Sequence, residues 1–418
     1  MFNRMREQRW FHVITVAFVM YTIAYIDRTN ISIALPDISR SLHLTPSQAG
    51  NASGIFFWGY LILQIPGGHL AERWSAKRFV TLLLVVWGCC SVLTGFVRTG
   101  HEFLLMRFLL GVAEGGVWPA TLVLLALWFP SRERARANAY WMLCLPAAVV
   151  LSSPLSGWIL EHWNWRVLLV SEGVFPLVWL IIWWLAIDDH PREARWISPE
   201  ERDYLEQALA REAAELNPEK HEPYVRSLVR PQVLLMVAVY FLLTTGNYGY
   251  LFWLPSAMEK ARKMGNVEVG LLFTIPYLIT AVGMVLMSKH SDKRHERRGH
   301  VSFGLGWGGV FLMGSILLSS VSPALSFALI ACAEAGPYGS LGPFWAIPTE
   351  TLPGSVSGSA MGLVNALGNL GGYFGPLLVG YVNQRTGTFF YPFALLSLAL
   401  FLGAALALFL PRRKVVMV

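Results

Sequence analysis

The sequence predicts an all-α membrane protein that crosses the bilayer about twelve times. Hydrophobic residues make up 55% of its 418 residues, charged residues make up only 14%, and the mean hydropathy is +0.48. That balance is too apolar for a soluble domain of this size. Apolar segments of roughly 20 residues, the length of a helix that spans the hydrocarbon core, recur along the whole chain. They are apolar on every face, whereas the strands of a membrane barrel alternate apolar and polar residues.

One long polar stretch divides the apolar segments into two sets. We expect residues 1–187 to form an N-terminal six-helix bundle, 188–230 a cytoplasmic linker, and 231–418 a C-terminal six-helix bundle. Within the linker, Ser198 followed by Pro199 and two glutamates predicts the start of a helix over about 198–215. The expected spans are 11–35, 48–69, 78–98, 102–129, 137–160, 167–187, 232–256, 268–288, 301–320, 324–348, 356–382 and 388–410.

The distribution of basic residues predicts the orientation of the chain. Most of the 33 Lys and Arg residues fall in alternate connections: before the first span, around 73–78, 132–136, 192–230 and 289–298, and after the last span. Cytoplasmic loops carry such an excess of basic residues. We therefore expect both termini to be cytoplasmic. Because the first segment lacks a cleavage site of small residues, we expect no removable signal peptide.

Other features bear on the function classes that the sequence excludes. The net charge of +7 follows from the loop bias, so we expect no nucleic-acid partner. The chain has no G-x4-G-K-[ST] phosphate loop, which argues against an ATP-driven pump. All four cysteines fall inside predicted spans, so we expect neither disulfides nor a metal site. No resident cofactor and no catalytic residue are expected.

Two loops at equivalent places in the two halves carry similar charge patterns. GGHLAERWSAKRF joins the second and third spans, and SKHSDKRHERRGH joins the eighth and ninth. An internal duplication of six-helix units is the architecture of alternating-access carriers.

The first of these loops resembles the pattern G-x-L-A-D-R-x-G-x-R/K-R of the major facilitator superfamily, with Glu72 in place of aspartate and Ser75 in place of glycine. From end to end the chain resembles the anion:cation symporter branch, which includes bacterial sugar-acid permeases and the vesicular glutamate and sialic acid carriers. The resemblance implies the fold of that superfamily and a monomer in the bacterial inner membrane. Its marks are Tyr25-Ile-Asp27-Arg28-Thr-Asn30, Arg107-x3-Gly111-x2-Glu114-Gly115, Trp128-Phe-Pro130-x2-Glu133-Arg134, Pro154-x2-Gly157 and Gly371-Gly372-x2-Gly375-Pro376.

Four charged side chains fall inside the first and fourth spans. A charge in the bilayer costs on the order of 2.5–3.5 kcal/mol, so Asp27, Arg28, Arg107 and Glu114 each need a reason. Arg107 and Glu114 are two helical turns apart on one face, and Gly111 leaves room between them for a small carboxylate. Arg28 points away from Asp27 and is expected to bridge to Glu114. We predict that protonation of Glu114, together with Asp27, frees both arginines to bind an anion; a static salt-bridge cluster is the alternative.

Further residues are candidates for contact with the substrate. In the resembling carriers, the residues at the positions of Tyr25, Tyr60, Trp345 and Asn365 line the pocket. Amide and hydroxyl groups both donate and accept hydrogen bonds, which suits a polyol, although helix packing explains any one of them equally well. The candidate hydroxyl-binding residues are Tyr60, Gln64, Asn247, Asn365 and Asn369.

Charged residues at the expected cytoplasmic ends form a separate set. We interpret them as a latch that holds the outward-facing state closed rather than as a substrate site. They are Glu72, Arg73, Arg78, Glu133, Arg134, Asp292 and Arg294. Glu334 is a further acid inside a span that matches no position of the resembling carriers, and either a proton site or a bystander role stays open.

The sequence thus predicts a proton-coupled symporter that imports a small organic anion, with aldonic, uronic or aldaric acids first by resemblance. Its expected partners are that anion, protons as the coupling ion, and membrane lipid. Three alternatives stay open: a symporter of aromatic or other monocarboxylates, an organic-anion exchanger or uniporter that uses no proton, and a polytopic sensor or membrane enzyme.

Overall fold

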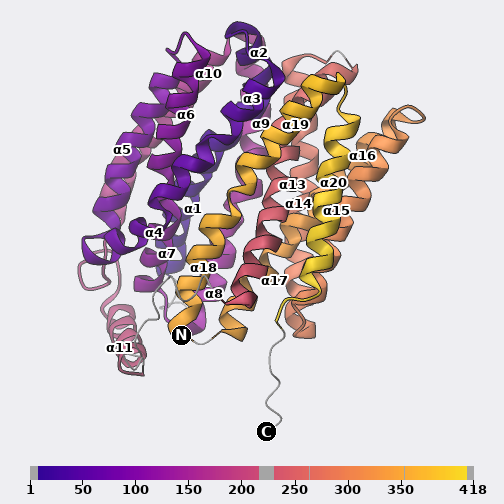
Figure 1. Ribbon diagram of the computed structural model, residues 1–418. Helices are drawn as coiled ribbons and strands as arrows, with labels where there is room; N and C mark the ends of the chain where they lie inside the picture. The colour runs from indigo at the N-terminus through magenta and orange to yellow at the C-terminus, as the bar shows by residue number, and fades with distance from the viewer. Residues whose placement is uncertain (1–7, 216–229, 263, 353, 412–418) are drawn as a thin grey trace.

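The computed structural model describes residues 8–215, 230–262, 264–352 and 354–411, and within them every regular element is an α-helix. The two chain ends expected to be cytoplasmic, 1–7 and 412–418, and the linker residues 216–229 lie outside the described residues. Two groups of helices stand side by side, one drawn from indigo to magenta and one from salmon to yellow (Figure 1).

The N-terminal group contains ten helices, several of which follow one another almost without a loop. Their bounds are α1 (Gln8–Thr29), α2 (Ile31–Ser41), α3 (Pro46–Gly54), α4 (Phe56–Arg73), α5 (Ala76–Thr94), α6 (Gly100–Gly115), α7 (Val117–Trp128), α8 (Ser131–Met142), α9 (Cys144–His162) and α10 (Trp165–Ala186). The breaks at Asn30, Ile55, Gly116 and Leu143 each interrupt one long helical rod rather than separate two spans.

The linker helix α11 (Pro199–Glu215) begins where the sequence predicts. The Ser198 hydroxyl accepts a hydrogen bond from the Glu201 N–H at 3.2 Å, which is the expected N-cap contact. The helices of the C-terminal group are α13 (Pro231–Arg262), α14 (Asn266–Arg294), α15 (Arg298–Leu318), α16 (Pro323–Ala333), α17 (Ala335–Thr351), α18 (Gly354–Gly368), α19 (Gly371–Thr386) and α20 (Phe390–Ala407).

Length and composition make nine helical stretches of the described residues suitable to cross a membrane. The expected spans 48–69, 324–348 and 356–382 are not among the nine. Each carries polar groups and is interrupted, at Ile55, at Glu334 and at Asn369–Leu370, although the breaks at Asn30, Gly116 and Leu143 do not remove their own rods from the nine. The total of twelve therefore stays a prediction for these three segments.

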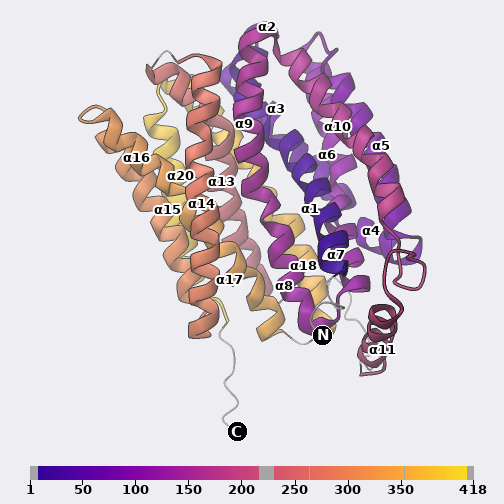
Figure 2. The same ribbon diagram turned by 180° about the vertical axis from the view of Figure 1, so that it is seen from behind.

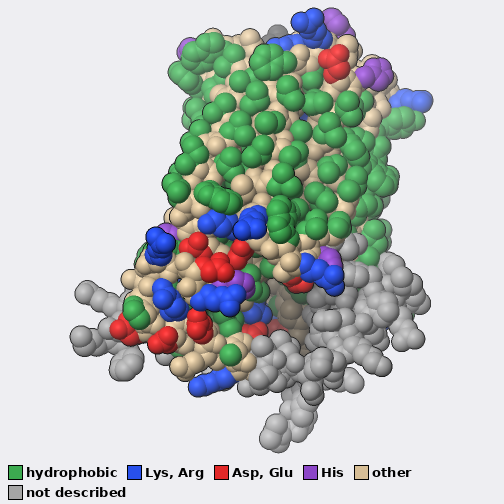
Figure 3. Space-filling view, turned by 90° about the vertical axis from the view of Figure 1, so that its left-hand side faces the viewer, with side chains coloured by type: hydrophobic (Ala, Val, Ile, Leu, Met, Phe, Trp, Pro, Cys, Tyr) green, Lys and Arg blue, Asp and Glu red, His purple; other side chains and the backbone are tan. Residues whose placement is uncertain are grey.

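The surface agrees with a membrane-embedded protein. Figure 3 shows a broad face of hydrophobic side chains, with acidic and basic side chains gathered below it and a few at its upper edge. Large exposed apolar residues on α5 and α10, such as Leu82, Val86, Val178 and Ile181, account for such a belt because lipid rather than water surrounds them. The chain is a multi-pass membrane protein by these features.

The two groups meet closely at the end opposite α11, where α2 and α3 lie (Figures 1 and 2). Here Arg40 of α2 pairs with Glu259 of α13 at 2.7 Å, and the Ser47 N–H donates to the side chain of Gln384 at 3.1 Å. The backbones approach so closely that an added Cβ at Gly380 would lie 2.2 Å from the Pro46 carbonyl oxygen. We call this contact, formed by the pairs Arg40–Glu259, Ser47–Gln384 and Pro46–Gly380, the glycine-lined joint. It closes that end of the molecule.

Candidate functional site

A buried ion pair between α1 and α6 lies at the centre of the N-terminal group. Nη2 of Arg28 donates to Oε2 of Glu114 at 3.0 Å, and Nε donates to the same oxygen at 3.4 Å. Arg28 exposes 3% of its surface and Glu114 exposes 1%. The predicted bridge between these residues is confirmed.

Aromatic rings surround the Arg28 guanidinium. Its carbon Cζ lies 4.7 Å from the centroid of Tyr60, 5.0 Å from that of Phe56 and 5.6 Å from that of Tyr25. Such rings attract a cation through their negative faces, more strongly where water is excluded. Arg28 is therefore held in place on several sides besides Glu114, and would stay positioned if Glu114 lost its charge.

Asp27 faces a different helix, as its adjacency to Arg28 predicts. Its carboxylate accepts a hydrogen bond from the Trp87 indole and another from the Ser91 hydroxyl at 2.6 Å, both on α5. No side chain of the described residues forms an ion pair with it. Asp27 is thus a buried acid satisfied by neutral donors.

Arg107 lies elsewhere than the sequence predicts. It is buried to 2% exposure with its guanidinium carbon 5.2 Å from the Phe56 ring, and its Nε and Nη2 have no hydrogen-bond partner among the described residues. The space beside Gly111 is also filled, because an added Cβ there would lie 2.0 Å from the Phe56 carbonyl oxygen. The expectation of a carboxylate lodged between Arg107 and Glu114 is therefore wrong for this conformation: Gly111 packs α4 against α6.

A cavity between the two groups includes Arg28 in its wall, whereas Arg107, Asp27 and Glu114 are not part of its lining. It encloses about 50 Å³, room for a few water molecules but not for a sugar acid, so the lining must move apart to admit one. Among the predicted substrate residues, those in the lining are Tyr25, Arg28, Tyr60, Asn247, Trp345, Asn365 and Asn369.

The predicted amides form a chain across the interface between the groups. Gln64 is outside the cavity lining: its Nε2 donates to the Gly115 carbonyl at 2.8 Å, and its Oε1 accepts from Asn365 Nδ2 at 2.6 Å. Asn369 donates to Asn365 Oδ1 at 2.9 Å. Oδ1 of Asn247 is buried without a partner, which leaves an acceptor toward the cavity. Gln64 thus supports Asn365 rather than lining the cavity.

The sequence analysis missed four tyrosines of the lining: Tyr21, Tyr240, Tyr248 and Tyr338. Helical spacing contains a signal for them. Tyr21, Tyr25 and Arg28 stand at positions i, i+4 and i+7 of α1, and Tyr240 and Tyr248 lie two turns apart on α13. Tyrosine in the middle of a span rather than at the membrane interface is the other available indication.

The analysis also missed Glu172 of α10, a buried acid with 1% exposure. Its carboxylate accepts from the Asn30 amide at the break between α1 and α2, and from the Ser156 hydroxyl at 3.0 Å. The rule that singled out Glu114, an acid inside a span, applies equally to Glu172. One cluster of three buried carboxyl groups and two buried arginines therefore lies in the N-terminal group: Asp27, Glu114, Glu172, Arg28 and Arg107.

Two of the predicted latch residues bind the linker helix. Glu133 pairs with the buried Arg9 and accepts from the Tyr204 hydroxyl at 3.2 Å, and Arg134 pairs with Glu212 of α11 at 3.0 Å. Arg9 also binds Glu201 at 2.6 Å, so it joins α1, α8 and α11, a role that the sequence analysis did not foresee.

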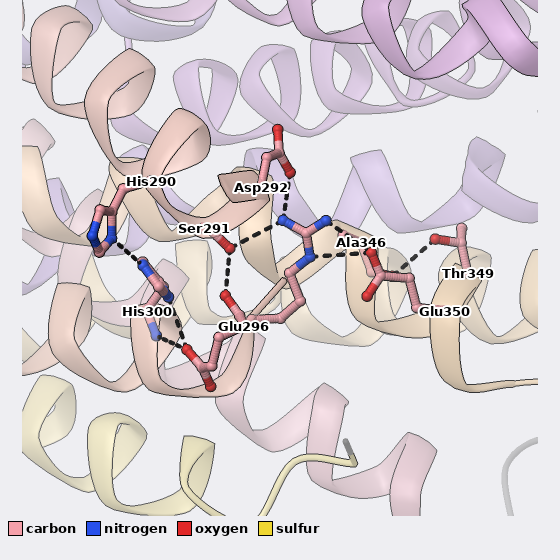
Figure 4. Close-up of polar contacts among 9 residues, drawn as sticks. His290, Ser291, Asp292, Glu296, His300, Ala346, Thr349 and Glu350 are labelled. Carbon is pink, nitrogen blue, oxygen red and sulfur yellow. Dashed lines mark hydrogen bonds and ion pairs between the residues drawn. The ribbon is translucent and has the colours of Figure 1, made fainter. Parts of the chain in front are cut away.

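In the C-terminal group, Asp292 pairs with Arg297 at 2.5 Å. Arg297 also binds Glu350 of α17 at 2.8 Å and the Ser291 hydroxyl at 3.1 Å (Figure 4). The side chains of the remaining latch candidates form no ion pair or hydrogen bond among the described residues; these are Glu72, Arg73, Arg78 and Arg294, all exposed. Each latch pair that forms lies inside one group or reaches α11, and none joins the two groups.

Comparison with known proteins identifies the class to which this fold and buried polar centre belong. The sequence model of the Major Facilitator Superfamily, a protein family, matches residues 17–376 and 266–417 of this chain. The chain belongs to this superfamily of membrane transporters, and it is a transporter rather than an enzyme.

Individual relatives span nearly the whole chain. A putative tartrate transporter of Agrobacterium vitis is 30% identical over 414 residues, 96% of this chain and 90% of the relative. A quinolone resistance transporter of Acinetobacter baumannii is 29% identical over 406 residues, 95% of this chain and 92% of the relative. Among solved structures, the Escherichia coli xylose transporter XylE in an inward open conformation superimposes with a TM-score of 0.79 at 17% identity, with 97% of each chain covered. That last likeness supports the fold alone.

Proposed function

We propose that this protein is a proton-coupled symporter that imports a small organic anion, a sugar acid such as an aldonate, uronate or aldarate, across the bacterial inner membrane. The observation that carries the proposal is the Arg28–Glu114 pair, in which a guanidinium of the cavity wall is neutralised by an acid that is not part of the lining. A relative of similar length is named a putative tartrate transporter, and tartrate is a hydroxylated dicarboxylate.

The coupling follows from competition for one cation. While Glu114 is ionised, Nε and Nη2 of Arg28 donate hydrogen bonds to it. An incoming carboxylate then meets an ion pair without net charge. Protonation of Glu114 removes that partner, and the guanidinium fork can then bind the substrate carboxylate with two parallel hydrogen bonds. Hydrogen bonds to charged groups contribute about 1.5–3 kcal/mol each, enough to make anion binding depend on the proton. Asp27, held by Trp87 and Ser91 nearby, is the second proton-binding residue of the proposal.

Alternating access requires the two helix groups to separate first at one end and then at the other. With twelve spans and both termini in the cytoplasm, the glycine-lined joint lies on the periplasmic side. The described conformation is then closed to the periplasm. Substrate leaves toward the cytoplasm once the groups separate around the amide chain of Gln64, Asn365 and Asn369.

The decisive experiment compares Glu114→Gln with the wild type in proteoliposomes. First, the purified protein is screened for stabilisation by an aldonate, a uronate, an aldarate and an aromatic carboxylate. Uptake of the stabilising acid is then measured with an imposed pH gradient. We expect the wild type to accumulate the acid and Glu114→Gln to bind it without accumulating it, because Arg28 is permanently free.

The matched control is Glu102→Gln, which removes an exposed acid from the same helix α6 and should accumulate the acid as the wild type does. If Glu114→Gln fails to fold while the control folds, the static salt-bridge interpretation is supported instead. Wild-type uptake that ignores a protonophore would favour an exchanger or uniporter.

A second substrate class is supported by the lining itself. Aromatic side chains form much of the cavity wall, and one relative is named a quinolone resistance transporter. Aromatic rings in the wall can stack on a flat aromatic acid, whereas a polyol needs the amides. Stabilisation by the aromatic carboxylate alone in the same screen would assign the protein to aromatic monocarboxylates.

A further inference from the structure

Glu334 is a buried acid of the C-terminal group that the proposed coupling does not use. It lies at the break between α16 and α17 and exposes 3% of its surface. Two residues later, an added Cβ at Gly336 would lie 2.2 Å from the Gly304 carbonyl oxygen of α15. The break is therefore packed tightly against its neighbour, and Glu334 is held inside the helix group rather than on the lipid face.

Within the described part of the chain, the Glu334 carboxyl has no counter-ion. None of the hydrogen bonds or ion pairs of the described side chains involves it, and its Oε2 is buried without a partner. Helix α15 contributes Trp307, which does not titrate and donates to the Cys332 carbonyl. The titratable groups around Glu334 are all uncharged in their ordinary forms: Tyr250 of α13, Tyr277 of α14, Cys332 of α16 and Tyr338 of α17.

Two more buried polar atoms on the neighbouring helix α14 lack partners in the part of the chain that the structure describes. They are the Tyr277 hydroxyl and the Thr280 hydroxyl, one turn apart, each on a residue with 0% exposure. An unmade hydrogen bond in the interior costs stability, and an unpaired buried carboxyl costs more. Glu334 therefore does not stabilise this conformation, and a costly ionisable group inside a membrane bundle is a mark of function.

Hydroxyl groups connect the surroundings of Glu334 to the proposed coupling pair. Tyr338, which faces Glu334, shares a hydrogen bond of 2.7 Å with the hydroxyl of Tyr25 in the other helix group. The Tyr25 ring in turn lies 5.6 Å from the Arg28 guanidinium carbon. Because the Tyr25–Tyr338 contact joins the two groups, their separation must break it.

We propose that Glu334 is a proton-binding site in the C-terminal group that exchanges its proton with water as the two groups move. In the packed conformation, with no cation at hand, the site accommodates the uncharged acid. When the groups separate and the Tyr25–Tyr338 contact opens, water reaches the carboxyl, and the proton passes to solvent while the carboxylate is hydrated. A proton from water on the other side restores the acid in the next cycle. This proposal rests on the proposed proton coupling and adds one acid to Asp27 and Glu114.

The first test needs protons alone and no substrate. Infrared difference spectra of the lipid-embedded protein are recorded between acidic and alkaline buffer for the wild type, Glu334→Gln and Glu268→Gln. We expect Glu334→Gln to lose one component of the carbonyl band of protonated carboxylic acids. Glu268→Gln, which removes an exposed acid of α14, should keep it. A spectrum of Glu334→Gln identical to that of the wild type would overturn the proposal.

The second test counts protons during transport. The acid that the wild type accumulates is held against opposing pH gradients until net flux stops, which gives the number of protons moved per anion. We expect Glu334→Gln to move one proton fewer, and an unchanged number contradicts the proposal. Should that variant fold poorly, Tyr338→Phe leaves the acid in place and removes the Tyr25–Tyr338 hydrogen bond. It should retain the infrared band at rest and lose the change in that band that the substrate causes in the wild type.

The outcomes separate this proposal from the proposed function. If the wild type transports its acid without moving protons, the proposed coupling fails. The substrate-free infrared titration then still decides whether Glu334 binds and releases a proton. If coupling is present and Glu334→Gln matches the wild type in both measurements, only the assignment of Glu334 fails.

Discussion

Substitution of Gly380 by alanine should force the two helix groups apart at the glycine-lined joint. The added Cβ would lie 2.2 Å from the Pro46 carbonyl oxygen, where ordinary carbon contacts begin near 3.4 Å. The obstacle is the backbone of α3, which cannot rotate away, so the groups must shift by about 1 Å or more to restore a normal contact. Overpacking of this kind costs about 1–3 kcal/mol.

That cost falls on only one conformation. A state in which the joint is open loses the clash with Pro46 and keeps only the 3.1 Å approach to the Trp253 ring inside the C-terminal group, so the equilibrium shifts toward it by a factor of roughly 5 to 150. Spin labels at positions 47 and 384, which face each other across the joint, report the change as a distance distribution measured in lipid nanodiscs. We expect the long-distance population of Gly380→Ala to grow at least about fivefold over the same labelled parent.

Two controls separate this effect from general damage. Gly306→Ala adds a methyl group with its nearest neighbour, Ala404, at 3.9 Å and should leave the distances unchanged. The added Cβ of Gly111→Ala would lie 2.0 Å from the Phe56 carbonyl oxygen inside the N-terminal group. This variant should therefore lower the melting temperature without opening the joint. If Gly380→Ala gives the parent's distance distribution, the joint does not limit opening and the reasoning is refuted.

Three further results are expected outside the membrane-spanning helices. Arg297→Ala loses three partners and should destabilise the protein by about 1–2 kcal/mol in a thermal melt, whereas exposed Arg294→Ala should have no measurable effect. Burial raises the pKa of the Glu296 carboxyl, but hydrogen bonds from the Gly299 N–H and from His300 outweigh burial and leave the pKa below its usual value. The stabilisation by ionised Glu296 is therefore complete above about pH 4.3 and is lost as pH falls through the lowered pKa. The difference in melting temperature between the wild type and Glu296→Gln should shrink on acidification through that range. A constant difference would contradict the reasoning. Ser198→Ala should remove the N-cap of α11 at a cost of about 1 kcal/mol and speed amide hydrogen exchange in its first turn, while Ser198→Asp should not.

Two structural features of the site were predictable because they follow from spacing along one helix. Adjacent residues on a helix face about 100° apart, so Asp27 and Arg28 had to serve different partners. The structure gives Trp87 and Ser91 to the first and Glu114 to the second. A charged residue inside a predicted span can also be recognised from the sequence alone. The same rule, applied to every span, would have identified Glu172 as a buried acid.

The place of Arg107 could not be obtained in this way. Its spacing from Glu114 is right for one helix face, yet that face packs against α4, where the Phe56 carbonyl fills the space beside Gly111. A glycine in sequence indicates either an open space or a close backbone approach, and only the neighbouring helix decides between them. For the same reason the sequence did not reveal the role of Arg297, which pairs with Asp292 and with Glu350 of α17.

By itself, the sequence determined that this chain is built for lipid, where most of its long apolar segments lie, and that Asp27, Arg28, Arg107 and Glu114 are buried. Composition and helical period decide these features locally, and a bilayer leaves few ways to satisfy a backbone. Only the tertiary structure decided which partners Arg9 and Arg297 take, which of two arginines reaches the cavity, and at which end the helix groups are closed. Those features depend on contacts between segments tens or hundreds of residues apart, and their geometry is fixed by packing rather than by any local pattern.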